Sequence, residues 1–209
     1  MSPHDPVLAP ARPRHLGAEE LTAALDHLRG SPTDDGTLAL VVRRGGVGER
    51  EVLTEGVLDL EVGLVGDTWL ERGSKRTPDG SAHPDMQLNV MSVRVAELVA
   101  DGRERMALAG DQLYLDLDLS EENLPAGTRL AIGGAGGAVI EVTALPHTGC
   151  PKFVDRFGAE AMRFVNGSTG RPLRLRGLNA RVVQAGTVRP GDTVRVSRPV
   201  PEVGVPSEA

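Results

Sequence analysis

The sequence contains little cysteine and few aromatic residues, and each shortage excludes a class of protein. The single cysteine, Cys150, rules out a disulfide within the chain and favours a reducing, cytoplasmic location. One tryptophan, one tyrosine and three phenylalanines in 209 residues, with a formal net charge of −6, argue against a nucleic-acid-binding surface. We therefore expect no nucleic-acid partner.

Long apolar runs and common catalytic motifs are also missing. Residues 1–15 contain four prolines and no apolar run, so we expect no signal peptide, no transmembrane helix and no membrane partner. Neither a Gly-x-Ser-x-Gly elbow nor a glycine–lysine phosphate loop is present. The glycine-rich residues 133–137 lie between two strand patterns instead of opening a helix, so they predict a hairpin and not a dinucleotide loop.

The apolar residues recur mainly with the spacing of strands. We expect eight or nine strands and two or three helices, with the most regular strand over residues 113–119. In that strand Tyr114, Asp116 and Asp118 alternate with leucines and are expected to face water. The glycines after residues 37–44 predict a hairpin with residues 57–62. Amphipathic helices are expected over residues 18–29 and 92–100, and after Cys150.

This pattern predicts a mostly β fold with inserted helices (α+β), in the form of a closed or nearly closed β-barrel. The length fits one domain, which we place at residues 37–197. An N-terminal helix and its connection occupy residues 16–36. Residues 1–15 and 198–209 are rich in proline and are expected to be mobile.

The segment around Cys150 carries the strongest chemical signal. Residues 138–144 are rich in β-branched residues, whereas Phe153, Phe157 and Val165 recur at helical spacing. Cys150 is therefore expected at a strand-to-helix junction, where Pro151 suits the first turn of the helix. Free N–H groups and the positive end of the helix dipole favour a readily ionised thiol there.

Basic residues dominate the sequence that follows Cys150, which predicts an anion-binding site. On an unbroken helix Lys152, Arg156 and Arg163 would form one stripe, and Arg174 and Arg176 follow. These five residues are the candidate phosphate contacts. Reactive thiols lie in such electropositive surroundings, whereas a free cysteine otherwise packs as a small buried hydrophobe.

Two histidines extend the candidate site. His147 stands three residues before Cys150, and these two are the candidate catalytic residues. The pair could form half of a zinc site that His83 and Asp85 complete, but structural zinc sites usually use more thiolates than this chain has.

Several short motifs occur in the order seen in MOSC domains, the domains named for the C-terminal part of molybdenum cofactor sulfurases. They are GLVGD at 63–67, the strand and helix at 86–100, ENL at 122–124, GTRLAIG at 127–133, EVT at 141–143 before Cys150, and VRPGD at 188–192. The chain resembles this family over roughly residues 37–197. It departs from the family in having Glu121 where many members have glycine, and Gly149 where many have proline.

The resemblance implies a β-barrel of the pyruvate-kinase-barrel type and a molybdenum–pterin cofactor. In the family the matching cysteine is thought to carry sulfur or to ligate molybdenum, so Cys150 is the candidate metal ligand. Asn123 and His83 join the candidate cofactor contacts. The implied activities are sulfur transfer or reduction of N-hydroxylated compounds, the latter with electrons from a partner protein. The alternative is a cofactor-free module that binds a small molecule or anion and has a structural cysteine.

Overall fold

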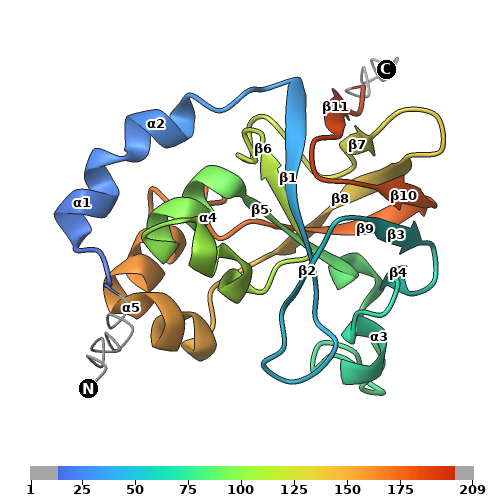
Figure 1. The fold of residues 1–209 in the computed structure, drawn as a ribbon, viewed down its shortest axis with the longest axis horizontal. Helices are drawn as coiled ribbons and strands as arrows, with labels where there is room; N and C mark the ends of the chain where they lie inside the picture. Colours follow the sequence, from blue (N-terminus) through green and yellow to red (C-terminus); the bar gives the residue numbers. More distant parts are fainter. Residues whose placement is uncertain (1–13, 201–209) are drawn as a thin grey trace, which may run out of the picture.

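The fold is a closed β-barrel of seven strands, seen in a computed structural model that describes residues 14–200 (Figure 1). The barrel strands are β1 (Asp35–Arg43), β5 (Leu88–Ser92), β6 (Leu113–Asp116), β7 (Arg129–Ile132), β8 (Ala138–Pro146), β9 (Leu178–Gln184) and β11 (Thr193–Ser197). They follow the order β11-β7-β8-β9-β5-β6-β1, and the pairing of β1 with β11 closes the ring. Only β5 and β6 pair in parallel. The predicted fold class is confirmed.

The first strand is long enough to join three neighbours. Residues Asp35, Gly36 and Thr37 pair with β11, the middle of β1 pairs with β6, and its end pairs with β2 (Glu51–Leu53). The prediction that this first strand forms a hairpin with residues 57–62 was therefore wrong. Strand β3 (Gly56–Asp59) instead joins β4 (Gly63–Leu64) and β10 (Gly186–Val188) in a small separate sheet. The predicted hairpin at 133–137 is confirmed by the pairing of Ile132 with Ala138.

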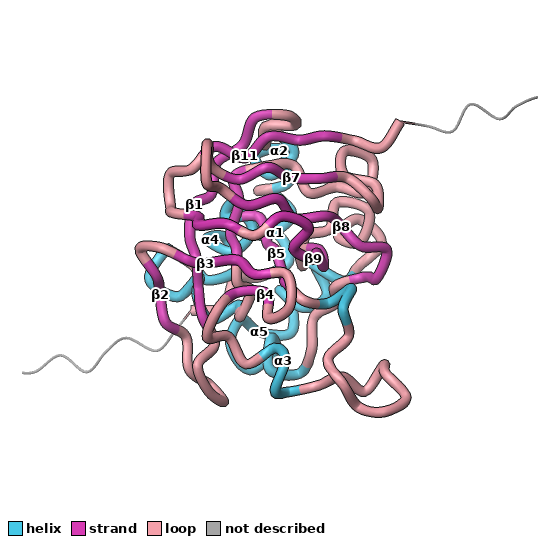
Figure 2. The backbone as a smooth tube through the Cα atoms, turned by 90° about the vertical axis from the view of Figure 1, so that its right-hand side faces the viewer, coloured by secondary structure: helices cyan, strands magenta, loops and turns pink. Residues whose placement is uncertain are grey.

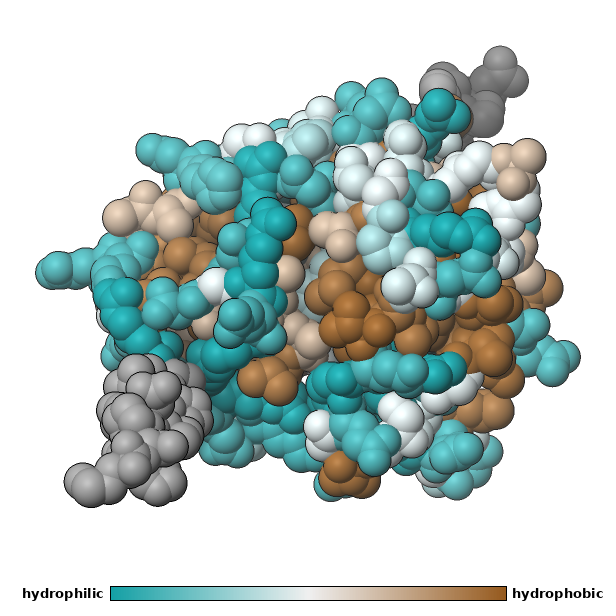
Figure 3. Space-filling view, in the orientation of Figure 1, coloured by the Kyte–Doolittle hydropathy of each residue, from teal (hydrophilic) through white to brown (hydrophobic). Residues whose placement is uncertain are grey.

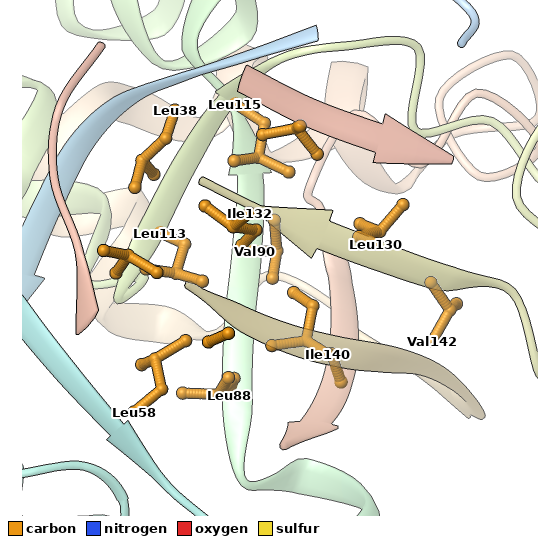
Figure 4. Packing of buried hydrophobic residues seen from close by; sticks show 14 of the residues in the cluster. Leu38, Leu58, Leu88, Val90, Leu113, Leu115, Leu130, Ile132, Ile140 and Val142 are labelled. Carbon is orange, nitrogen blue, oxygen red and sulfur yellow. The ribbon is translucent and has the colours of Figure 1, made fainter. Parts of the chain in front are cut away.

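Aliphatic side chains fill the inside of the barrel (Figure 4). Leu113 and Leu115 on β6 point inward beside Leu38 and Val90, and all four are fully buried. Alternation along a strand places every second residue on one face, which is why these leucines line the interior. The interior is a packed core, so we expect ligand-binding sites on the outside of the barrel.

Helices cover one side of the barrel (Figures 1 and 2). They are α1 (Ala18–Ala23), α2 (Leu25–Arg29), α4 (Val93–Ala100) and α5 (Pro151–Asn166), while α3 (Trp69–Arg72) and two 3-10 turns, η1 (Pro84–Met86) and η2 (Arg103–Ala109), lie in connections. Beneath them lies a second core cluster, to which the outer face of β6 contributes Tyr114. The expectation that Tyr114 faces water was wrong, because the helices bury it and its hydroxyl donates to Met106 O at 3.1 Å.

Helix α5 is broken at Gly158, whose φ of 91° and ψ of 165° are far from helical values. The break separates Arg163 from Lys152 and Arg156. The single basic stripe expected from an unbroken helix is therefore wrong. Glycine is the residue that tolerates this positive φ without steric cost, so the kink is encoded locally.

The ends and the surface add two observations. The predicted mobile ends fall mostly outside the described residues, which stop at Arg14 and Val200. Apolar side chains gather over β2, β3 and β4 (Figure 3), where Val52, Val57 and Leu60 are exposed. Among residues 14–200, the helices are all too short or too polar to cross a bilayer.

Candidate functional site

Cys150 lies at the junction of β8 and α5, as predicted. It is the N-cap of α5, with extended backbone angles, and it is exposed. Pro151 follows as the first helical residue, where its missing N–H costs nothing. Gly149 N donates to Asn166 Oδ1 at 3.1 Å, which ties the junction to the end of the same helix. A side chain at Gly149 would start 2.4 Å from Met162 Sδ, so a larger residue there would require the Met162 side chain to move.

A basic cavity of about 380 Å³ lies beside the first turn of α5. It is formed by the glycine-rich residues 45–48 after β1, by α3 and by Lys152. Its polar lining consists of Arg44, Arg50, Thr68, Glu71, Arg72 and Lys152. Four cations face one carboxylate there, which suits an anionic ligand.

The arginines of the basic cavity differ in their partners. Arg44 is almost fully buried and donates to both carboxylate oxygens of Asp67 at 2.8 and 2.7 Å, so its charge is balanced. Arg50 is half-buried and forms no ion pair within residues 14–200, and its Nε is buried without an acceptor. Burial, followed by the nearby cations Arg156 and Arg44, lowers the pKa of Arg50. An anion bound in the cavity would relieve this repulsion.

A second cavity, of about 240 Å³, lies on the other side of the Cys150 junction. We call it the His147 cavity, and it is lined by His147, Arg174 and Arg176 together with Thr148 and Asn166. The structure thus brings together three of the predicted site residues. The residues lining the two cavities do not include Cys150 itself.

His147 is largely buried and directs its Nδ1 toward the buried Asp111. Its Nδ1 lies 3.3 Å from Asp111 Oδ1, but without the geometry of a hydrogen bond. Burial, with the cations Arg176 and Arg44, holds the pKa of His147 well below its ordinary value. The imidazole is therefore neutral near pH 7, and its assignment as a general acid or base for Cys150 is not supported by this geometry.

Arg176 makes structural contacts, which do not favour its predicted role as a phosphate contact. It is 7% exposed, and its Nη1 donates to both oxygens of Asp111 at 2.9 and 2.8 Å. The guanidinium also lies over the ring of Phe153, 5.1 Å from its centroid. Burial raises the pKa of Asp111, and Arg176 counteracts part of that effect. Arg174 is partly occupied as well, since its Nη1 donates to Leu124 O at 2.7 Å.

The remaining predicted residues lie outside both cavities. Arg163 is exposed and pairs with Glu160, and Arg156 donates to Leu108 O at 2.6 Å while its charge acts on Arg50. His83 caps η1, where its Nδ1 accepts from Asp85 N at 3.2 Å. Asn123 is used internally, because its amide donates to Thr33 O and Asp118 O and accepts from Arg198. Its prediction as a cofactor contact stays a prediction that these internal hydrogen bonds do not favour.

Sequence reasoning missed Arg44, Arg50 and Arg72, which supply most of the charge of the basic cavity. Two signals were available: a glycine-rich loop at 45–48 flanked by arginines, and Asp67 at the end of the GLVGD motif. Within residues 14–200 no cluster of three or more His, Cys, Asp or Glu side chains is arranged to hold a metal ion.

Comparison with known proteins identifies the fold. No protein-family model matches the chain, and no curated protein matches it in sequence. Among solved structures, the YuaD protein from Bacillus subtilis matches with a TM-score of 0.56 and 16% identity, covering 79% of this chain and 97% of that one. YiiM from Geobacillus stearothermophilus matches with a TM-score of 0.54 and 14% identity, covering 78% and 75%. YiiM from Escherichia coli gives 0.50 and 19%, covering 78% and 71%.

YuaD and YiiM are MOSC-domain proteins, so the fold of this chain is MOSC-like. At these identities the likeness concerns the fold. It agrees with the order of short motifs and with the position of Cys150 at the end of β8.

Proposed function

We propose that this protein is a MOSC-type protein that binds a phosphate-bearing molybdenum–pterin cofactor next to Cys150. The observation that carries the proposal is the Arg50 guanidinium, whose charge has no ion-pair partner within residues 14–200 and lies near the cations Arg156 and Arg44. Arg50 lines the same cavity as Lys152, which follows Cys150 by two residues. An anionic ligand in the cavity would balance this charge.

The residues present fit the phosphate of such a cofactor. Arg50 and Arg72 offer planar guanidinium groups that can bind phosphate oxygens in pairs, and Lys152 adds a point charge. Asp67 holds Arg44 in place, so that side of the cavity is fixed before the ligand arrives. Thiolate is a soft ligand that suits a transition metal, and the Cys150 thiol is exposed at a helix N-terminus.

The chemistry would be divided between the cofactor and the chain. When bound, the cofactor supplies two-electron oxygen-atom or sulfur transfer. The chain binds the phosphate, positions Cys150 and keeps the basic cavity positive. We expect reduction of N-hydroxylated compounds or sulfur transfer as the activity, with electrons for the former from a partner protein.

The test is metal analysis of protein purified from a molybdenum-replete host that makes the pterin cofactor. We expect near-stoichiometric molybdenum in the wild type and a strong loss in Cys150→Ala, with retained folding because Cys150 is exposed. Ser168→Ala, an exposed change at the far end of α5, is the control and should keep its molybdenum. Wild-type protein without molybdenum would contradict the cofactor proposal.

A cofactor-free anion-binding module is the second candidate. It is favoured by the fact that Cys150 is absent from the lining of both cavities. In that case the protein would bind pyrophosphate at the basic cavity, would carry no molybdenum, and would bind pyrophosphate equally well as Cys150→Ala. Calorimetric titration with pyrophosphate, combined with the metal analysis, separates the two candidates.

A further inference from the structure

A third cavity, of about 530 Å³, lies away from the basic cavity, between α2, α4 and the chain that follows β6. We call it the leucine cavity. Its apolar walls come from Leu28 on α2, Val95 on α4, and Leu117, Leu173 and Leu175. A cavity of this size with apolar walls can enclose the body of a small organic molecule.

The leucine cavity is separated from the His147 cavity by the segment 173–176. Leu173 and Leu175 line the leucine cavity, whereas Arg174 and Arg176 line the His147 cavity. Successive side chains therefore lie on opposite sides of this segment. Glu121 is the one residue that lines both cavities. The cofactor proposal makes no use of the leucine cavity.

Ser92 supplies an unpartnered polar group in the leucine cavity. It is 7% exposed and lines the cavity, and its hydroxyl forms no hydrogen bond with any residue from 14 to 200. Ser92 is the N-cap of α4, yet its side chain does not cap the helix. A serine at this position usually accepts from a helical N–H group. Its hydroxyl is therefore left available for a ligand.

The polar part of the lining is acidic. The lining of this cavity holds Asp118, Glu121 and Glu122 but one cation, Arg29, whose Nη1 lies 3.6 Å from Asp26 Oδ1. Arg174, in the lining of the His147 cavity, interacts electrostatically with Glu121 and offsets part of its charge. Asp118 is held in place because its carboxylate accepts from the N–H and the hydroxyl of Ser120 at 2.9 and 3.1 Å. Such an arrangement attracts a cation and repels an anion.

We propose that the leucine cavity binds a small organic ammonium compound. The ammonium group lies at Glu121 and Glu122, an aliphatic or aromatic body lies between the leucines, and a polar group on that body bonds to the Ser92 hydroxyl. Charge, apolar walls and the free hydroxyl each select one part of this ligand. The ligand class is an amine with an apolar body.

The experiment is calorimetric titration of the full chain with phenethylamine and with 3-phenylpropanoate, which share an aromatic body and differ in charge. We expect saturable binding of phenethylamine in the millimolar range or tighter, and about tenfold weaker binding of the anion. The double variant Glu121→Gln/Glu122→Gln should lose this preference. Glu104→Gln, an exposed acid outside the cavity without an ion pair in the described chain, should retain it.

Three results would overturn the proposal: no saturable binding of phenethylamine, equal or tighter binding of the anion, or an unchanged preference in the double variant. Tyramine, which adds a hydroxyl to the ring, tests the inner end of the cavity. Its affinity should fall about threefold in Ser92→Ala while that of phenethylamine stays the same. Equal tyramine affinity in the two proteins would remove Ser92 from the site.

Discussion

Two groups of basic residues near the Cys150 junction look alike in sequence and differ in their surroundings. Arg44 and Arg176 are at most 7% exposed, and each donates to a buried carboxylate, Asp67 or Asp111. Arg50 and Lys152 line a cavity and form no ion pair in the described part of the chain. The first group is internally neutralised and stabilises the fold. The second group has unbalanced charge and can attract a ligand.

The largest expected effect comes from breaking a neutralised pair. Asp111→Ala leaves Arg176 buried without its partner, and removing one member of such a pair costs about 3–5 kcal/mol of unfolding free energy. Urea denaturation followed by circular dichroism measures it. The double variant Asp111→Ala/Arg176→Met should recover most of the loss, because no unpaired charge remains. Equal stability of Asp111→Ala and wild type would show that the pair is not structural.

The unbalanced group should show the opposite behaviour. Arg50→Gln removes a cation that others repel, so stability should hold or rise slightly, while pyrophosphate binding weakens about tenfold to a hundredfold. Calorimetric titration measures the affinity and thermal unfolding the stability. The matched control is Arg195→Gln, an exposed arginine on β11 away from the cavity, which should leave the affinity unchanged. Strong destabilisation by Arg50→Gln would place Arg50 in the structural group.

The pH dependence of the folding stability provides a further test, through the buried His147. Its pKa is depressed in the folded protein, so below about pH 6.5 the unfolded chain binds more protons and stability falls as the pH is lowered. The slope for one such group is at most about 1.4 kcal/mol per pH unit. The raised pKa of Asp111 contributes with opposite sign, because there the folded state holds the extra proton.

Comparing wild type with His147→Gln isolates the histidine, since both proteins retain Asp111. We expect the variant to lose less stability than wild type between about pH 6.5 and pH 5, as measured by urea denaturation at each pH. Parallel curves for the two proteins would mean that folding does not depress the pKa of His147.

The smallest effect is expected at Arg163. The kink at Gly158 removes it from the other basic residues, and it is exposed and paired with Glu160. Arg163→Glu should therefore change pyrophosphate affinity by less than about twofold and leave the melting temperature unchanged. A loss of pyrophosphate affinity as large as that of Arg50→Gln would instead show that Arg163 acts together with the other basic residues, as a continuous basic stripe predicts.

Several features of the fold and the site could be predicted from local patterns. Alternation along residues 113–119 identified the inward leucines, and the change from β-branched to helical spacing placed Cys150 at the start of α5. The same alternation gave the wrong environment for Tyr114. A strand pattern identifies two faces, but it cannot show that a helix layer covers the second one.

The sequence could not show which basic residues are structural. Arg176 pairs with Asp111, which is 65 positions away in the sequence, and Arg44 pairs with Asp67, which is 23 positions away. No local spacing predicts either pair. The kink at Gly158 likewise divided a stripe that ideal helical geometry had joined.

The sequence by itself determined the seven barrel strands, the helix starts and the position of the only cysteine, because these depend on apolar periodicity, proline and glycine within a few residues. The tertiary structure decided which charges are neutralised, which cavities exist and what lines them. Those properties depend on contacts between segments distant in the chain. Burial makes the difference in folding free energy between a paired and an unpaired arginine large.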